Sequence, residues 1–113
     1  MKLIILESPY SGEVQRNLTY ARRAMRHSLE ENEVPIAFHL IYTQEGILDD
    51  TQPDQREWGI RASQEWYFKA AMVAAYTDYG ITPGMKRGIE HALQHEVPII
   101  YRQIGTNPRG TET

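Results

Sequence analysis

The chain has 113 residues and a formal net charge of −3 at pH 7, and it contains no cysteine. This length is that of one domain, and the lack of cysteine excludes disulfides, thiolate nucleophiles and cysteine-based zinc sites. An apolar fraction of 41% and a charged fraction of 24% are typical of an ordinary soluble globular protein, which we expect in the cytoplasm, and the negative charge offers no basic field that would attract nucleic acid or a membrane.

The first predicted element is a buried strand at Leu3–Leu6, a continuous apolar run that the pair Ser8–Pro9 ends. The run is too short for the apolar region of a signal peptide or for a membrane span. Apolar or small residues then recur at helical spacing from Val14 to Leu29. We therefore expect a helix that lies on a sheet and begins near Ser11 or Gly12.

The second strand is predicted at Ile36–Tyr42, directly after Pro35. A turn-rich loop at 43–53 follows, and loops of this length in a compact domain are often functional. The next helix is expected to begin near Pro53, because proline suits an early helical position. Its apolar side carries Trp58, Ala62 and Trp66, and we expect the two tryptophans in the core or in a dimer contact.

The last predicted elements are a strand at Met72–Tyr76, a helix that Thr82 and Pro83 open, and a strand at Ile99–Tyr101. Strands that alternate with crossover helices form a parallel sheet. The sequence therefore predicts an α/β protein with a small Rossmann-like parallel sheet of about four strands, flanked by helices in a single domain. We expect this domain to span residues 1–102 and an unpatterned tail to span 103–113.

The loops after the first three strands are rich in polar and turn-forming residues. Such loops share one edge of a parallel sheet, where open α/β sheets bind ligands. The loop at 8–12 precedes a helix, whose free N–H groups suit a phosphate or a sugar hydroxyl, and Tyr10 can stack on a base. Asp78 follows a strand, where a carboxylate accepts hydrogen bonds from ribose. A nucleoside or nucleotide is the expected ligand. The candidate binding residues are Ser8, Pro9, Tyr10, Ser11, Gly12, His39, Tyr42, Asp49, Asp78, Thr82, Gly84 and Met85.

Simpler interpretations of these residues stay open. Ser11 and Gly12 can merely cap a helix, His39 can be a hydrogen-bonded core residue, and Asp49 can begin a turn. The loop at 8–12 lacks the glycine spacing of a Walker or dinucleotide-binding motif. It therefore gives no support to ATP hydrolysis or hydride transfer.

Two other clusters favour no special chemistry. His91 and His95 are four residues apart on a predicted helix, but a metal site needs more ligands, so we expect no metal and no cofactor. The arginine-rich stretch at 16–26 is followed at once by glutamates within 30–33. This pattern is typical of a solvated, mixed-charge helix face rather than of a nucleic-acid site.

A series of motifs runs in order along nearly the whole chain. They are Ser-Pro-Tyr-Ser-Gly at 8–12, Arg16-Asn17, Tyr20-Ala21-Arg22, His39-Leu40 with Tyr42-Thr43-Gln44, Leu48-Asp49-Asp50, Arg56 with Gly59-Ile60, Trp66, Tyr76-Thr77-Asp78 with Gly80-Ile81, Gly84-Met85, and Gly88-Ile89-Glu90 with Ala92. With them the chain resembles the nucleoside 2-deoxyribosyltransferase-like family, in the form of small, largely uncharacterised phage and bacterial proteins. The resemblance implies a binding role for Asn17 and a homo-oligomer in which the tail containing Asn107 completes a neighbour's pocket.

Family members cleave the bond between base and sugar, with a glutamate on the last helix as nucleophile. The resemblance places Gly88 where this glutamate stands, and Glu90 lies roughly 200° further round the helix. It also implies that Asp78 is a catalytic loop carboxylate. If chemistry persists without the usual nucleophile, the candidate carboxylates are Asp78, Asp49, Asp50 and Glu65.

Three functional hypotheses result. The leading one is a protein that binds a nucleoside- or nucleotide-derived ligand without the usual catalytic glutamate, for example to sequester a nucleotide signal. The alternative is an active N-glycosidase or deoxyribosyltransferase that uses a relocated carboxylate. A purely structural or protein-interaction module is the third, and it predicts that no small molecule stabilises the fold.

Overall fold

Four parallel strands form a single sheet in the computed structural model, which describes residues 1–106. The strands β1 (Lys2–Glu7), β2 (Glu33–Ile36), β3 (Met72–Tyr76) and β4 (Ile99–Arg102) lie in the order β2-β1-β3-β4. The predicted α/β architecture with one parallel sheet is confirmed. The predicted role of the tail around Asn107 concerns residues outside the described part of the chain.

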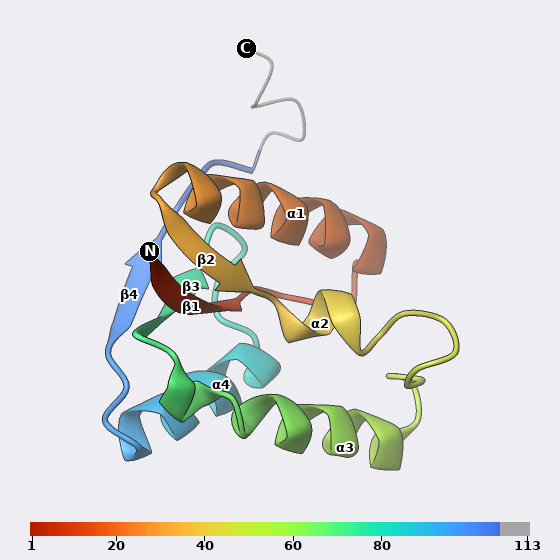
Figure 1. Ribbon diagram of the computed structural model, residues 1–113. Helices are drawn as coiled ribbons and strands as arrows, with labels where there is room; N and C mark the ends of the chain where they lie inside the picture. Colours follow the sequence, from red (N-terminus) through yellow and green to blue (C-terminus); the bar gives the residue numbers. More distant parts are fainter. Residues whose placement is uncertain (107–113) are drawn as a thin grey trace.

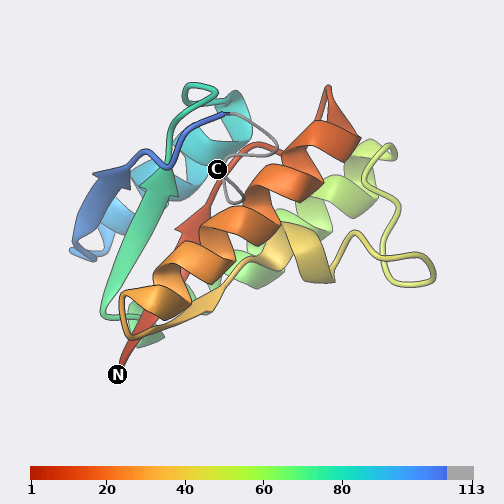
Figure 2. The ribbon, with the colours of Figure 1, turned by 90° about the horizontal axis from the view of Figure 1, so that it is seen from above.

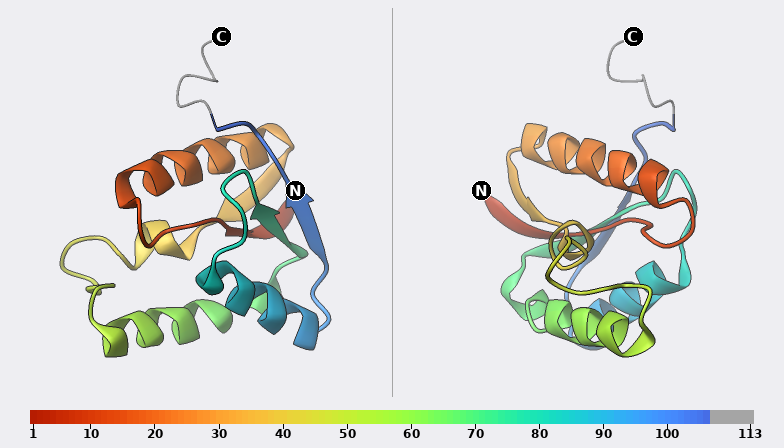
Figure 3. Two further views of the ribbon diagram at one scale, coloured as in Figure 1. Left: turned by 180° about the vertical axis from the view of Figure 1, so that it is seen from behind. Right: turned by 90° about the vertical axis from the view of Figure 1, so that its right-hand side faces the viewer.

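Helices cover both faces of the sheet and make a three-layer arrangement. The long helix α1 (Val14–Glu30) lies on one face, while α3 (Pro53–Gln64) and α4 (Pro83–Gln94) lie on the other (Figures 1 and 3). Seen from above, α1 runs diagonally across the strands (Figure 2). Crossover helices on both faces explain why the strand sequences are continuous apolar runs rather than alternating ones.

The core has two parts, one on each face of the sheet. On the face of α1, Ile4 and Leu6 of β1 pack with Tyr20 of the helix. On the face of α4, Ile5 packs with Ala92. Successive residues of β1 thus point to opposite faces, as the pleat of a strand requires. Glu7 lies two residues after Ile5, so its side chain points to the same face of the sheet, toward α4.

The register of β2 determines what surrounds the end of β1. Residues Lys2–Ile5 of β1 pair with Glu33–Ile36, and β2 ends there, two residues before β1 does. The short helix α2 (Phe38–Ile41) follows directly and lies beside the carboxyl end of β1. The edge of the sheet next to Glu7 is therefore lined by a helix instead of a strand.

The predicted strand at Ile36–Tyr42 is wrong. The strand covers Glu33–Ile36 and includes Pro35, which an edge strand tolerates because no ladder hydrogen bond is needed from it. The backbone then turns into α2, where the Tyr42 N–H donates to the Phe38 carbonyl at 2.9 Å. A short apolar run does not distinguish a strand from a helix by its periodicity, so the boundary depended on pairing with β1.

The two tryptophans do not lie in the core as expected, and the alternative expectation of a dimer contact stays a prediction. The α3 helix ends at Gln64, before Trp66, and none of its side chains is buried. Trp58 is 66% exposed and does not belong to the core. Trp66 is half exposed and its ring lies 6.0 Å from that of Phe38. Within residues 1–106 no helix has the length and apolar character needed to cross a membrane.

Candidate functional site

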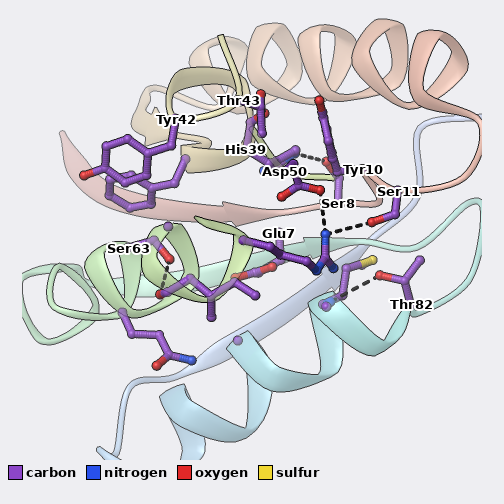
Figure 4. Close-up of a pocket in the computed structure, with 18 of the residues that line it drawn as sticks. Glu7, Ser8, Tyr10, Ser11, His39, Tyr42, Thr43, Asp50, Ser63 and Thr82 are labelled. Carbon is purple, nitrogen blue, oxygen red and sulfur yellow. Dashed lines mark hydrogen bonds and ion pairs between the residues drawn. The ribbon is translucent and has the colours of Figure 1, made fainter. Parts of the chain in front are cut away.

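A cavity of about 450 Å³ opens at the carboxyl end of β1, between α2, α3 and α4. The end of β1 and the loop after it form one wall, and α2 with the residues after it forms a second (Figure 4). The helices α3 and α4 close the remaining sides. The volume lies within the range of small-molecule sites, and its place at the edge of a parallel sheet is the usual one for ligands in α/β proteins.

The carboxyl group of Glu7, at the end of β1, lines the cavity beside α4. It accepts a hydrogen bond from the hydroxyl group of Tyr67, which belongs to the short 3-10 helix η1 (Tyr67–Lys69). No described residue forms an ion pair with Glu7. Burial raises the pKa of Glu7 to about 8. The carboxyl group is therefore largely protonated near neutral pH and can donate as well as accept a hydrogen bond.

Gly88 of α4 lies directly against this carboxyl group. A Cβ atom added at position 88 would lie 2.7 Å from Cδ of Glu7 and 2.7 Å from Oη of Tyr67. Contacts this close do not occur without displacement of a neighbour. The lack of a side chain at Gly88 is what makes room for the carboxyl group of Glu7 at the wall of the cavity.

A second polar pair, Ser8 and His39, stands beside Glu7. Ser8 Oγ lies 2.7 Å from His39 Nε2, which joins the loop after β1 to helix α2. Burial lowers the pKa of His39 to about 4, so the imidazole is neutral near pH 7. A neutral ring fixed by a hydroxyl group can offer a hydrogen bond of defined direction to a ligand.

Arg56 of α3 connects three segments at the mouth of the cavity. Its Nη1 atom donates to Ser11 Oγ at 2.9 Å and to Asp50 Oδ2 at 2.7 Å. Its Nη2 atom lies near the first turn of α4, where a Cβ at Gly84 would be 3.2 Å away. The hydroxyl group of Thr82 caps the same helix by accepting from the Met85 N–H.

Most of the residues predicted from the loops do line the cavity. They are Ser8, Tyr10, Ser11, Gly12, His39, Tyr42, Thr82, Gly84 and Met85. The three loops thus meet at one edge, because the strands before them are parallel. Their role in binding stays a prediction.

Four predicted residues, Pro9, Asn17, Asp49 and Asp78, do not line the cavity. The buried amide of Asn17 donates to the carbonyl groups of Tyr10 and Ser11, at 2.9 and 3.1 Å, and so holds the loop at 8–12 in place. Asp49 is exposed and caps a turn by accepting from the N–H and the hydroxyl group of Thr51.

Asp78 lies on the α1 side of the sheet, away from the cavity lining. It accepts a 2.5 Å hydrogen bond from the hydroxyl group of Tyr20 and bonds from the N–H groups of Ile104 and Gly105. Burial acts to raise the pKa of Asp78, but these hydrogen bonds outweigh it and lower the pKa. The carboxylate thus ties α1 to the chain that follows β4.

The sequence interpretation missed Glu7, and it named Arg56 only as part of the family resemblance, without a binding role. Of the relocated carboxylates it named, only Asp50 lines the cavity. Glu7 had one recognisable feature, an acidic residue at the carboxyl end of an otherwise apolar strand. The spacing of α3 did not distinguish Arg56 from Arg61 of the same helix; only the family resemblance, which includes Arg56 with Gly59-Ile60, did so. Within residues 1–106, no three His, Asp or Glu side chains form a group that could hold a metal ion.

The fold and the cavity define an α/β protein with a ligand-sized site at the edge of a parallel sheet. The chain matches the family model of a domain of unknown function (DUF7768) over residues 2–102, and it belongs to that family. No curated protein matches the chain.

Among solved structures, the chain is similar to the 2-deoxyribosyltransferase of the psychrotolerant bacterium Bacillus psychrosaccharolyticus, a biocatalyst for the synthesis of nucleosides. The TM-score is 0.67 and the sequence identity 14%, over 89% of this chain and 72% of that chain. At this identity the likeness is one of fold. The predicted deoxyribosyltransferase-like fold is confirmed.

Proposed function

We propose that the protein binds a nucleoside-derived small molecule in the cavity at the end of β1. The half-buried carboxyl group of Glu7, which lines the cavity without an ion-pair partner among the described residues, is the observation that carries this proposal. Burying such a group costs stability unless it is paired, and the described residues provide only the hydroxyl group of Tyr67. A perturbed carboxyl group inside a ligand-sized cavity is characteristic of functional sites.

The lining of the cavity suits a base and a sugar. The rings of Tyr10 and Tyr42 belong to its wall, and aromatic rings stack on bases. Ser8, His39 and Glu7 offer hydrogen bonds of the kind that sugar hydroxyls and base edges accept or donate. The structural neighbour is a 2-deoxyribosyltransferase, which supports a nucleoside as the class of ligand.

A second candidate function is cleavage of the bond between base and sugar, and the position of Glu7 favours it. In its protonated form, Glu7 would donate its proton to the departing base while water attacks the anomeric carbon, and the proton that the water loses would return to the Glu7 carboxylate. In its ionised form, it would attack that carbon itself while the base leaves and takes a proton from solvent, and water would then hydrolyse the resulting ester and restore the carboxylate. Glu7 would then be the relocated carboxylate, in place of the four that the sequence suggested.

Mass spectrometry of incubated ligands separates the two functions. The protein would be incubated with a panel of nucleosides, deoxynucleotides, NAD, ADP-ribose and cyclic nucleotides, and the solution measured before and after heat denaturation. A compound that disappears and returns intact on heating means binding. Free base before heating, absent with Glu7→Gln, means cleavage.

A matched control is Glu65→Gln, since Glu65 is exposed and does not line the cavity. This variant should behave as the wild type in either case. If no compound is depleted and no base is released, the proposed function is wrong and an interaction module becomes the better account of the fold.

We propose further that the protein works as a homo-oligomer. Ile100 and Tyr101 of the edge strand β4 are 40% and 54% exposed, and Leu93 of the neighbouring helix is 62% exposed. Exposed apolar side chains on a sheet edge suit pairing with another chain. Light scattering coupled to size-exclusion chromatography measures the mass directly, and a monomer at all concentrations would contradict the proposal.

A further inference from the structure

The charges at the mouth of the cavity indicate what kind of group the ligand carries. Arg56 is the only arginine or lysine among the described residues that line the cavity. The acidic residues of the lining are Asp50, which pairs with Arg56, and Glu7, whose carboxyl group lies against Gly88 of α4. A single guanidinium group at the opening is suited to one anionic group of a ligand.

The two ends of the guanidinium group differ in what they contact. Nη1 is held by Asp50 and Ser11 at 2.7 and 2.9 Å. Nη2 makes no hydrogen bond with a described residue, and it lies against Gly84, where even a Cβ would come within 3.2 Å. One end of the group is thus anchored, and the other is left for a ligand beside the bare backbone of Gly84.

The anchoring makes this arrangement favourable for binding. An arginine side chain loses conformational entropy when it binds, but Asp50 and Ser11 have already fixed Arg56. The planar donors of a guanidinium group match the oxygens of a phosphate. The side chain is 35% exposed, so a phosphate can reach it from solvent while the rest of the ligand enters the cavity.

We infer that Arg56 binds the phosphate of a nucleoside monophosphate, with the nucleoside directed into the cavity toward Glu7. This inference rests on the proposed function and names its substrate class. Each further phosphate would add negative charge near Asp50, and the described lining holds no second cation to contact it. The mouth thus selects the monophosphate over the nucleoside and over the higher phosphates.

Isothermal titration calorimetry tests the inference with the four deoxynucleosides, their 5′-mono-, di- and triphosphates, and inorganic phosphate. The wild type should bind one monophosphate at least tenfold more tightly than its nucleoside and more tightly than its di- and triphosphates. Arg56→Ala should bring the ratio of monophosphate to nucleoside affinity down to about one, whatever its effect on nucleoside affinity itself. Arg56→Lys should retain part of the advantage, because it keeps the charge but not the planar donors.

The matched control is Arg61→Ala, an exposed arginine of the same helix that does not line the cavity. It should bind every compound as the wild type does, and thermal melting should show all three variants folded. Equal affinity for nucleoside and monophosphate in the wild type would overturn the inference but leave the proposed function intact. So would an advantage that survives Arg56→Ala, a preference for di- or triphosphate, or inorganic phosphate that binds as tightly as the nucleotide. If no nucleoside or nucleotide binds, the proposed function itself fails.

Discussion

The carboxyl group of Glu7 occupies the space that a side chain at Gly88 would need. The two residues belong to different elements, the end of β1 and the middle of α4, and a Cβ at Gly88 would lie 2.7 Å from Cδ of Glu7. Each residue therefore limits what the other can be. In this chain the carboxyl group at this wall of the cavity comes from the strand and not from the helix.

This relationship predicts that Gly88→Ala is destabilising although alanine favours helices. The added methyl group would force the ends of the Glu7 and Tyr67 side chains to shift, and because the end of a flexible side chain shifts more easily than backbone, we expect a cost near the lower end of the range of about 1–3 kcal/mol typical of overpacking. In a background of Glu7→Ala and Tyr67→Phe, the same substitution should cost much less. Urea denaturation of the four proteins measures the coupling, and Lys86→Ala, exposed on the same helix, is the control. Equal costs in both backgrounds would contradict the predicted contact.

The raised pKa of Glu7 leads to a prediction of how the free energy of unfolding depends on pH. Its pKa is about 8 in the folded protein, against an ordinary value of 4.5. Between these values the folded state binds more protons than the unfolded state, so the contribution of Glu7 to stability falls as pH rises through this window. Glu7→Gln cannot ionise and should be more stable than the wild type at pH 9, by a few kcal/mol at most, since one pKa unit corresponds to about 1.4 kcal/mol.

Thermal melting from pH 4 to pH 9 makes this measurement. The melting temperatures of Glu7→Gln and wild type should be close at pH 4, diverge as the pH rises from about 4.5 to about 8, and stay apart above that. The exposed Glu65→Gln serves as control and should follow the wild type throughout. Parallel curves for Glu7→Gln and wild type would mean that Glu7 is ionised in the folded protein.

The lowered pKa of His39 leads us to expect a pH dependence of stability with the opposite sign. Burial lowers its pKa to about 4, from an ordinary value of 6.5. The unfolded state therefore binds more protons between these values, and stability should be lost as pH falls from 6.5 through 4. His39→Asn should flatten this part of the stability curve. NMR titration of the imidazole gives the pKa directly, and a value near 6.5 would refute the prediction.

The variant Asp78→Asn tests whether Asp78 has a structural role or a role in ligand binding. Asp78→Asn should lower the free energy of unfolding by about 1–3 kcal/mol, because it weakens the hydrogen bonds to Tyr20, Ile104 and Gly105. Ligand binding in the cavity should be unchanged when measured well below the melting temperature. Glu45→Gln, on an exposed loop, is the control. A folded Asp78→Asn variant that no longer binds ligand would restore the role that the sequence predicted for Asp78.

The sequence by itself determined the layers of the fold and the location of the cavity. Apolar runs such as Leu3–Leu6 and the helical spacing from Val14 onward are local patterns, and alternating strands and helices admit a parallel sheet whose loops meet at one edge. The sequence therefore placed Ser8, His39 and Thr82 near one another, and all three line the cavity.

Tertiary structure alone decided which groups face the cavity from within. Glu7 meets Gly88 across 81 positions of the chain and Arg56 meets Ser11 across 45, because the register of β1 and the packing of α3 and α4 bring them together. The end of β2 was decided in the same way, by pairing with β1 that stops at Ile36. Local patterns report which face a residue prefers, but burial, pKa and contact depend on neighbours that only the folded chain provides.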